Sequence, residues 1–168
     1  MNKKLMVLSL VLVSIAFLLS FAFTEEKRNS RFETLKSLEG DWVGEWAGNT
    51  SKDVKATFRL ISGGTSVLQT VNDFHGEMVT TYYPDMNSLM ATHYCNANNQ
   101  PRLRSNPSAT ANVITFFYQD STNMASAAEG HIEKLVITLQ DSNHLRQDWT
   151  WKEGDATRTD TLSFKRSK

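Results

Sequence analysis

From residue 40 onward, apolar and polar residues alternate along most of the chain, which is the pattern of half-buried β-strands. From Val54 to Leu60, for example, every second residue is apolar and the residues between them are Lys, Thr and Arg. Similar alternation predicts about ten short strands, at residues 42–46, 54–60, 65–71, 77–83, 89–95, 101–105, 113–118, 131–140, 144–152 and 158–165. Short strands at this regular spacing favour an all-β sandwich or barrel over βαβ units.

The predicted connections are mostly short enough for hairpins. Turn-forming residues occupy 63–64, 84–87, 141–143 and 153–155. A series of hairpins forms a meander, and a meander of this length removes its exposed edges best by closing on itself. We therefore expect an antiparallel up-and-down β-barrel of about ten strands. The longest connection, residues 120–130, is the expected mobile lid.

A short helix is predicted before the first strand. Ser30 and Glu33 have the spacing of a capping box, and Gly40 can end the helix with a positive φ. Three apolar residues would share one face of this helix: Phe32, Leu35 and Leu38. A helix of about two turns is marginal alone, so we expect it to pack against the barrel and close one end.

The N-terminal segment has the composition of a secretory signal peptide. A basic start, Lys3 and Lys4, precedes an apolar run that ends at Phe23, and residues 20–22 form a small-residue cleavage site. Residues 1–22 are the expected signal peptide and residues 23–168 the expected barrel domain. The alternative is an uncleaved N-terminal membrane anchor, since the apolar run nearly suffices to cross a bilayer. Both interpretations place the domain outside the cytoplasm, in the periplasm or the medium.

The charge balance limits the possible partners, and the cysteine content limits how the domain can be stabilised. The chain has 18 Lys and Arg and 18 Asp and Glu. Loss of residues 1–22 removes two lysines, which leaves 16 basic against 18 acidic residues and a net charge of −2. This balance, without basic runs, argues against nucleic acid and against a membrane surface as partners after signal removal. A single cysteine excludes an intramolecular disulfide, so an ordinary apolar core must stabilise the domain.

The segment Leu38-Glu39-Gly40-Asp41-Trp42, in which a predicted helix is followed by Gly-x-Trp at the start of the first strand, resembles the calycin superfamily. This superfamily includes lipocalins and fatty-acid-binding proteins. The resemblance implies a barrel whose closed end holds Trp42 under a cation, supplied here by Arg158, Lys165 or Arg166. The segment Thr92-His93-Tyr94-Cys95, followed by Asn99-Gln100-Pro101-Arg102, is similar to exported bacterial lipocalin-like proteins. Calycins carry small apolar ligands, and a related ten-stranded barrel binds haem. No haem-ligand motif matches the four histidines, so no cofactor is expected.

The strand at residues 89–95 carries the densest candidate chemistry. Its alternation places His93 and Cys95 on the same face as Leu89 and Ala91, which indicates the barrel interior. A histidine near a thiol can activate a nucleophile or offer two ligands to a soft metal. It is also compatible with a buried, apolar cysteine beside a hydrogen-bonded histidine. Both active interpretations lack further partners, so no catalytic residue and no metal ligand is assigned.

A polar loop follows this strand, and Asn99 and Gln100 in it are candidates for a hydrogen-bonding rim around a ligand. Arg102 and Arg104 lie on the face opposite Leu103. If Leu103 points inward, both arginines face solvent. If the face is reversed, they form an internal clamp for a carboxylate, for which the planar guanidinium is suited.

The sequence therefore predicts a barrel that holds one small, apolar or amphipathic molecule. The expected ligand-binding residues are six in the walls (Trp46, Phe58, His93, Cys95, Phe117 and Trp149) and three near the mouth (Asn99, Gln100 and Arg102). Two alternatives remain open. One is an enzyme that acts on a small reactive substrate through His93 and Cys95, and the other is a structural or interaction module whose barrel is filled by side chains.

Overall fold

The chain folds into a closed barrel of ten antiparallel strands, here described from a computed structural model over residues 31–47, 53–106 and 112–167. The strands are β1 (Gly40–Trp46), β2 (Val54–Ile61), β3 (Ser66–Asp73), β4 (Gly76–Asp85), β5 (Ser88–Tyr94), β6 (Gln100–Ser105), β7 (Val113–Thr122), β8 (His131–Asp141), β9 (His144–Glu153) and β10 (Ala156–Arg166). Each strand pairs with its neighbour in sequence, and β10 pairs with β1 to close the barrel.

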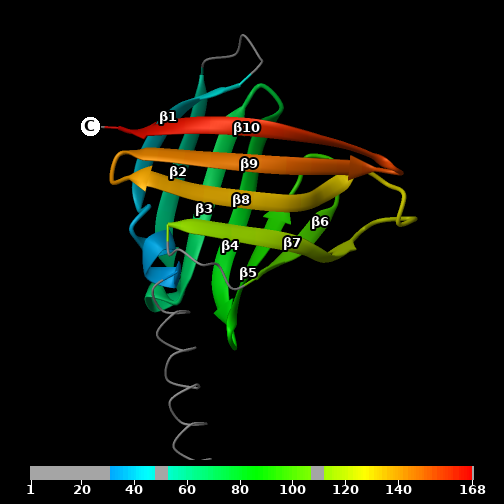
Figure 1. Cartoon of the computed structure of the whole chain (residues 1–168), viewed down its shortest axis with the longest axis horizontal. Helices are drawn as coiled ribbons and strands as arrows, with labels where there is room; N and C mark the ends of the chain where they lie inside the picture. Colours follow the sequence, from blue (N-terminus) through cyan, green and yellow to red (C-terminus); the bar gives the residue numbers. More distant parts are fainter. Residues whose placement is uncertain (1–30, 48–52, 107–111, 168) are drawn as a thin grey trace, which may run out of the picture.

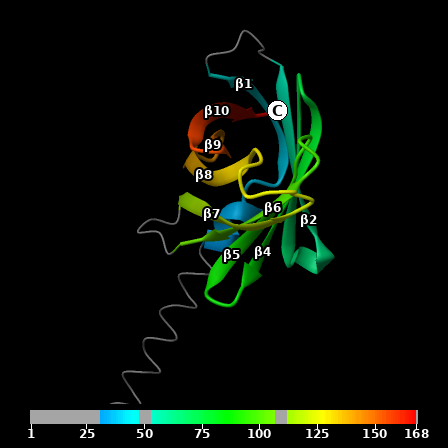
Figure 2. The ribbon, with the colours of Figure 1, turned by 90° about the vertical axis from the view of Figure 1, so that its right-hand side faces the viewer.

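The barrel is flattened into two facing layers. In Figure 1, β8, β9 and β10 run across the front, and β2 to β5 cross behind them at a steep angle. Figure 2 shows the same two groups of strands on opposite sides of the interior. The up-and-down barrel predicted from the alternation of apolar residues is thus confirmed, although β7 continues to Thr122, beyond its predicted end at residue 118.

Several features of the N-terminus lie outside the described residues, namely the predicted signal peptide at residues 1–22 and Ser30 of the predicted capping box. The helical segment is seen at residues 31–36, where it lies at one end of the barrel (Figure 1). Across the described ranges, no helix combines the length and apolar character required to cross a membrane.

The helical segment closes its end of the barrel around Trp42. The indole Nε1 of Trp42 donates a hydrogen bond of 2.8 Å to the carbonyl oxygen of Leu38, and the ring packs edge-on against Phe58. Gly40 adopts a φ of +128°, which an L side chain rarely adopts, so the glycine lets the chain turn from the helix into β1.

Arg166 is the cation over Trp42, which the sequence left open among three basic residues. Trp42 and Arg166 are cross-strand partners between β1 and β10, so both project on the same face. The guanidinium carbon lies 4.3 Å from the centre of the indole ring. The guanidinium also donates to the carbonyl oxygens of Ser37 and Glu39, at 2.7 Å each, which ties the end of the helical segment to the last strand.

Arg166→Ala should lower the free energy of unfolding by about 1–2 kcal/mol, because it removes charged hydrogen bonds and a cation–π contact. Lys165→Ala is the matched control, since Lys165 is exposed on the next position of the same strand and should change stability by about 0.5 kcal/mol or less. Urea unfolding followed by tryptophan fluorescence measures both. Equal effects of the two substitutions would show that Arg166 does not hold the closed end together.

The barrel interior next to the closed end is filled. Its largest fully buried apolar side chains come from both layers and from the helical segment: Leu35, Leu38, Trp42, Phe58, Leu89, Leu103, Ile114, Phe116, Leu135 and Ile137. This apolar core stabilises the fold without disulfides, since the one cysteine is free.

A layer of buried polar side chains lies within the barrel. The amides of Gln69 on β3 and Gln147 on β9 exchange two hydrogen bonds, of 2.9 and 3.1 Å, across the interior. The hydroxyl of Tyr82 on β4 donates to Oε1 of Gln69 at 2.6 Å. Because these groups satisfy one another, they can be buried at little cost and they hold the two layers at a fixed separation.

Candidate functional site

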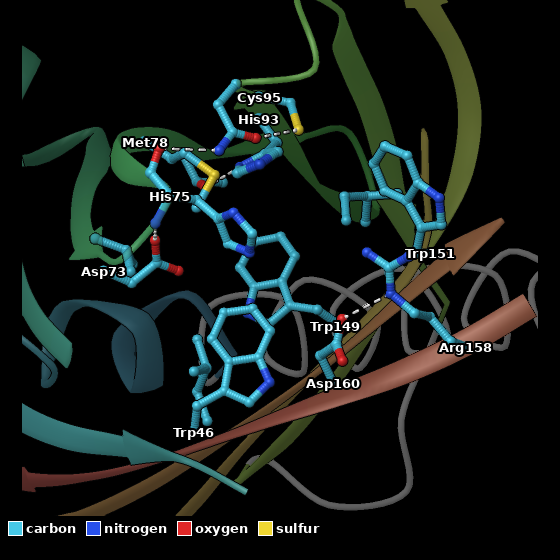
Figure 3. Close-up of a pocket in the computed structure, with 15 residues that line it drawn as sticks. Trp46, Asp73, His75, Met78, His93, Cys95, Trp149, Trp151, Arg158 and Asp160 are labelled. Atoms are coloured by element: carbon cyan, nitrogen blue, oxygen red, sulfur yellow. Dashed lines mark hydrogen bonds and ion pairs between the residues drawn. The ribbon is translucent and has the colours of Figure 1, made fainter. Parts of the chain in front are cut away.

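A cavity of about 140 Å³ occupies the barrel on the other side of the polar layer (Figure 3). Fifteen residues line it: Trp46, Val71, Asp73, His75, Met78, Thr80, His93, Cys95, Asn96, Ile132, Trp149, Trp151, Arg158, Asp160 and Leu162. His75, Asn96 and Arg158 are exposed as well as lining, so the cavity opens to solvent at this end of the barrel.

The alternation along the strands explains why the cavity lies here. Gln69, Tyr82 and Gln147 belong to the polar layer, and residues two positions away on the same strands face the same interior. These residues are Val71 on β3, Thr80 on β4 and Trp149 on β9, and all three line the cavity. The polar layer therefore forms a floor that separates the cavity from the filled core.

His93 is the most deeply buried titratable group of the cavity wall, with 5% of its surface exposed. Its Nδ1 is 2.9 Å from the hydroxyl of Thr80, and its ring centre is 4.9 Å from that of Trp149. Burial lowers the pKa of His93 from 6.5 to about 4, because the charged form loses its hydration. His93 is therefore neutral at pH 7 and offers hydrogen bonding rather than charge.

Cys95 lies next along the same face, at the start of a tight turn. Its amide N–H donates to the carbonyl of Asn99 at 3.1 Å, and its carbonyl accepts from the N–H of Asn98 at 3.1 Å. The thiol lies 3.7 Å from Oδ1 of Asn96. Burial raises the pKa of the Cys95 thiol above its usual value, so at neutral pH the group is a protonated thiol and a weak nucleophile.

An aromatic cluster forms the rim of the cavity. The ring of Trp46, at the end of β1, is 5.4 Å from that of Phe74 and 6.0 Å from that of His75. Phe74 and His75 form the turn between β3 and β4, and their ring centres are 3.9 Å apart. The side-chain amide of Asn96 donates to the carbonyl of His75 at 3.2 Å, which joins this turn to the turn after β5.

Charged side chains lie on two sides of the cavity, as Figure 3 shows. On β10, Nε of Arg158 is 3.3 Å from a carboxylate oxygen of Asp160, and the guanidinium lies 5.4 Å from the Trp151 ring. On β3, Asp73 accepts a hydrogen bond of 2.7 Å from the N–H of His75. Within the described ranges, no cluster of three or more His, Cys, Asp or Glu side chains has an arrangement that could hold a metal ion.

The structure brings together four of the nine predicted ligand-binding residues: Trp46, His93, Cys95 and Trp149 all line the cavity. Two other predicted wall residues lie elsewhere. Phe58 points inward as expected but packs against Trp42 in the filled core. Phe117 points outward and is 40% exposed, because Ile114 and Phe116 occupy the inward positions of β7. The prediction that Phe117 faces the interior is wrong.

The three residues predicted near the mouth do not line the cavity. Asn99 is buried and donates from Nδ2 to the carbonyl of Gly130 at 2.8 Å. Gln100 hydrogen-bonds with Thr122 on the neighbouring strand. Arg102 is half exposed and pairs with Asp120 at 2.6 Å. Leu103 is fully buried and therefore points inward. Arg102, on the opposite face of β6, points to solvent, so the internal carboxylate clamp is not formed.

Several residues that line the cavity were not predicted from the sequence, although the alternation along their strands points to an inward position. Asp73 continues the inward phase of Val71 but lies beyond the predicted end of its strand. Arg158 and Asp160 continue the inward phase of Leu162 and Phe164, yet charged residues do not suggest an interior position. Trp151 shares the face of Trp149, and Gly130 leaves room for it, since a Cβ there would lie 2.1 Å from the indole.

Comparison with known proteins gives a fold and no family. No protein-family model and no curated protein sequence matches the chain. Among solved structures, the crystal structure of Rv2717c from M. tuberculosis is similar, with a TM-score of 0.56 and 15% sequence identity. The match covers 82% of this chain and 98% of that chain. At this identity the likeness concerns the fold alone.

Proposed function

We propose that this protein is an exported calycin-like carrier that binds a small, apolar or amphipathic molecule in the cavity at the open end of its barrel. The observation that carries the proposal is the cavity itself, which lies on a satisfied polar floor and is walled by Trp46, Trp149 and Trp151. Concave sites with aromatic walls and a few placed polar groups are the usual form of small-molecule sites. His93 supplies such a polar group, hydrogen-bonded to Thr80.

The size of the cavity limits the enclosed part of the ligand. An engineered apolar cavity of about 150 Å³ in another protein accommodates benzene. A volume of about 140 Å³ therefore suits a group of that size, and a longer ligand would extend through the rim between His75 and Arg158.

The two alternatives receive less support. An enzyme that uses Cys95 as nucleophile needs a lowered thiol pKa, whereas burial raises it, and His93 is neutral at pH 7. A barrel filled by side chains would leave no cavity, whereas here the filled part ends at the layer of Gln69, Tyr82 and Gln147.

Trp149→Leu should weaken binding of small apolar ligands at least about tenfold, since it removes an aromatic wall of the cavity. Phe117→Leu is the matched control, because it removes an aromatic ring from the outer face of β7 and should leave the affinity unchanged. Isothermal titration with a panel of small aromatic and aliphatic compounds, neutral, cationic and anionic, measures both. Unchanged affinity in Trp149→Leu, or binding by none of the compounds to the wild type, would contradict the proposed function.

Export is tested separately, by the mass of the protein isolated from cells of its own host. Cleavage after Ala22 predicts a chain that begins at Phe23 and carries any retained ligand as an added mass in native mass spectrometry. A full-length chain recovered from the membrane fraction would instead support the N-terminal anchor. A full-length chain recovered from the cytoplasm would contradict export.

A further inference from the structure

Asp73 is a buried carboxylate with an oxygen that has no partner. The residue ends β3, lines the cavity and is 9% exposed. Its Oδ1 accepts the N–H of His75, but Oδ2 is buried and has no hydrogen-bond partner within the described residues. Figure 3 shows the Asp73 carboxylate on the side of the cavity away from Trp151 and Arg158. A buried carboxylate with one oxygen unpartnered and no opposite charge beside it is costly, so this group calls for a compensating positive group.

None of the charged side chains around the cavity compensates Asp73. Arg158 pairs with Asp160 on β10, so those two charges largely cancel. His93 is neutral at pH 7 and hydrogen-bonds to Thr80. Across the described ranges, Asp73 forms no ion pair. The cavity therefore carries one uncompensated negative charge at a buried position.

Other walls of the same cavity are aromatic. Trp46, Trp149 and Trp151 line the cavity together with Asp73. Indole faces attract cations, and sites walled by several aromatic rings recognise quaternary ammonium groups. The Trp151 ring already has the Arg158 guanidinium 5.4 Å away, which shows that one of these rings accepts a cation.

A metal ion is a poorer match than an organic cation. Calcium and magnesium need six or more oxygen ligands, and zinc needs at least three protein ligands. The described part of the chain has no cluster of His, Cys, Asp or Glu that meets this requirement. A ligand with a carboxylate is also disfavoured, because the Arg158 guanidinium already pairs with Asp160. The buried indole N–H groups of Trp149 and Trp151, which have no partner within the described residues, would meet a neutral acceptor such as a hydroxyl.

We propose that the ligand is a small organic cation with an alkylated ammonium group, which pairs with Asp73 and lies against the tryptophan faces. This inference rests on the proposed function and adds the chemical class of the molecule. The cavity volume of about 140 Å³ suits an ammonium of the size of tetramethylammonium or choline.

The test compares choline with its neutral isostere 3,3-dimethylbutan-1-ol, in which carbon replaces the charged nitrogen. Isothermal titration of the wild type with both compounds should show choline binding at least about tenfold more tightly. Asp73→Asn keeps an oxygen that can accept from the N–H of His75 but removes the charge. It should abolish the preference for choline and leave the affinity for the isostere within about twofold. Asp120→Asn, on the outer face, is the control and should keep the preference.

The failure of this inference differs from failure of the proposed function. Hexanoate, a small anion, is titrated in the same way. If the wild type binds the isostere or hexanoate as tightly as choline, the proposal of a cationic ligand is overturned and the proposed carrier function stands. If no cationic, neutral or anionic compound binds, both proposals fall. The comparison of ligands on the wild type requires no variant, so an Asp73→Asn protein that fails to fold leaves the test valid.

Discussion

Trp42→Ala should lower the free energy of unfolding by about 3–5 kcal/mol, the usual loss when a large aromatic side chain is removed from a core. Trp42 is 1% exposed and contacts three different parts of the closed end. It packs against Phe58 of β2, donates to the carbonyl of Leu38 and lies under the guanidinium of Arg166. The substitution therefore leaves a cavity where the helical segment meets the first and last strands of the barrel. Urea denaturation followed by far-UV circular dichroism measures the loss.

Trp42→Phe is the matched variant, because it keeps an aromatic ring under Arg166 and loses the hydrogen bond to Leu38. It should cost about 1–2 kcal/mol, the value of one buried hydrogen bond and a smaller ring. A loss below about 1 kcal/mol in Trp42→Ala would contradict the view that this end of the barrel is a packed closure.

The sequence allowed the strands to be predicted because alternation is a local property. The inward phase of β5 follows from Leu89 and Ala91, and the same phase correctly places His93 in the interior. Where two aromatic residues are adjacent, as in Phe116 and Phe117, only one can face inward, and composition alone does not choose between them. Ile114 faces inward, and residues two positions apart share a face, so Phe116 is the one of the two that faces inward.

Pairing register is not a local property, and it limited the prediction of the site. The cation over Trp42 is Arg166 because β1 and β10 pair Trp42 with Arg166. Phe58 is inward, but the pairing of β1 with β2 sets it opposite Gly40, at the closed end and away from the cavity. Neither pairing is visible in one strand alone, so the sequence could place a residue on a face but not at a height in the barrel.

The second limit on predicting the site was whether charged residues face the barrel interior or the solvent. Asp73 and Asp160 line the cavity although aspartate is seldom buried, and their inward positions follow from strand phase alone. Charge favours the surface whereas phase favours the interior, and the sequence does not reveal which prevails. Such conflicts between a local preference and the fold are expected at functional or strained sites.

His93 should make the protein less stable as the pH falls from 7 to 4. The pKa of His93 is lowered to about 4 in the folded protein, against 6.5 as its ordinary value. The unfolded chain therefore takes up a proton at a higher pH than the folded barrel does. The stability that this histidine supports is complete above pH 6.5 and is lost as the pH falls towards the folded pKa of about 4. The difference in pKa corresponds to a loss of about 3 kcal/mol over that range.

His93→Gln isolates this effect, because an amide can hydrogen-bond to Thr80 without taking up a proton. Free energies of unfolding measured in urea at intervals from pH 7 to pH 4.5 should fall more steeply for the wild type than for His93→Gln. His144→Gln removes an exposed histidine from the outer face and should follow the wild-type slope. Parallel curves for the wild type and His93→Gln would mean that His93 is hydrated in the folded protein. That result would also contradict its place in the wall of a largely apolar cavity, because burial is the cause of its low pKa.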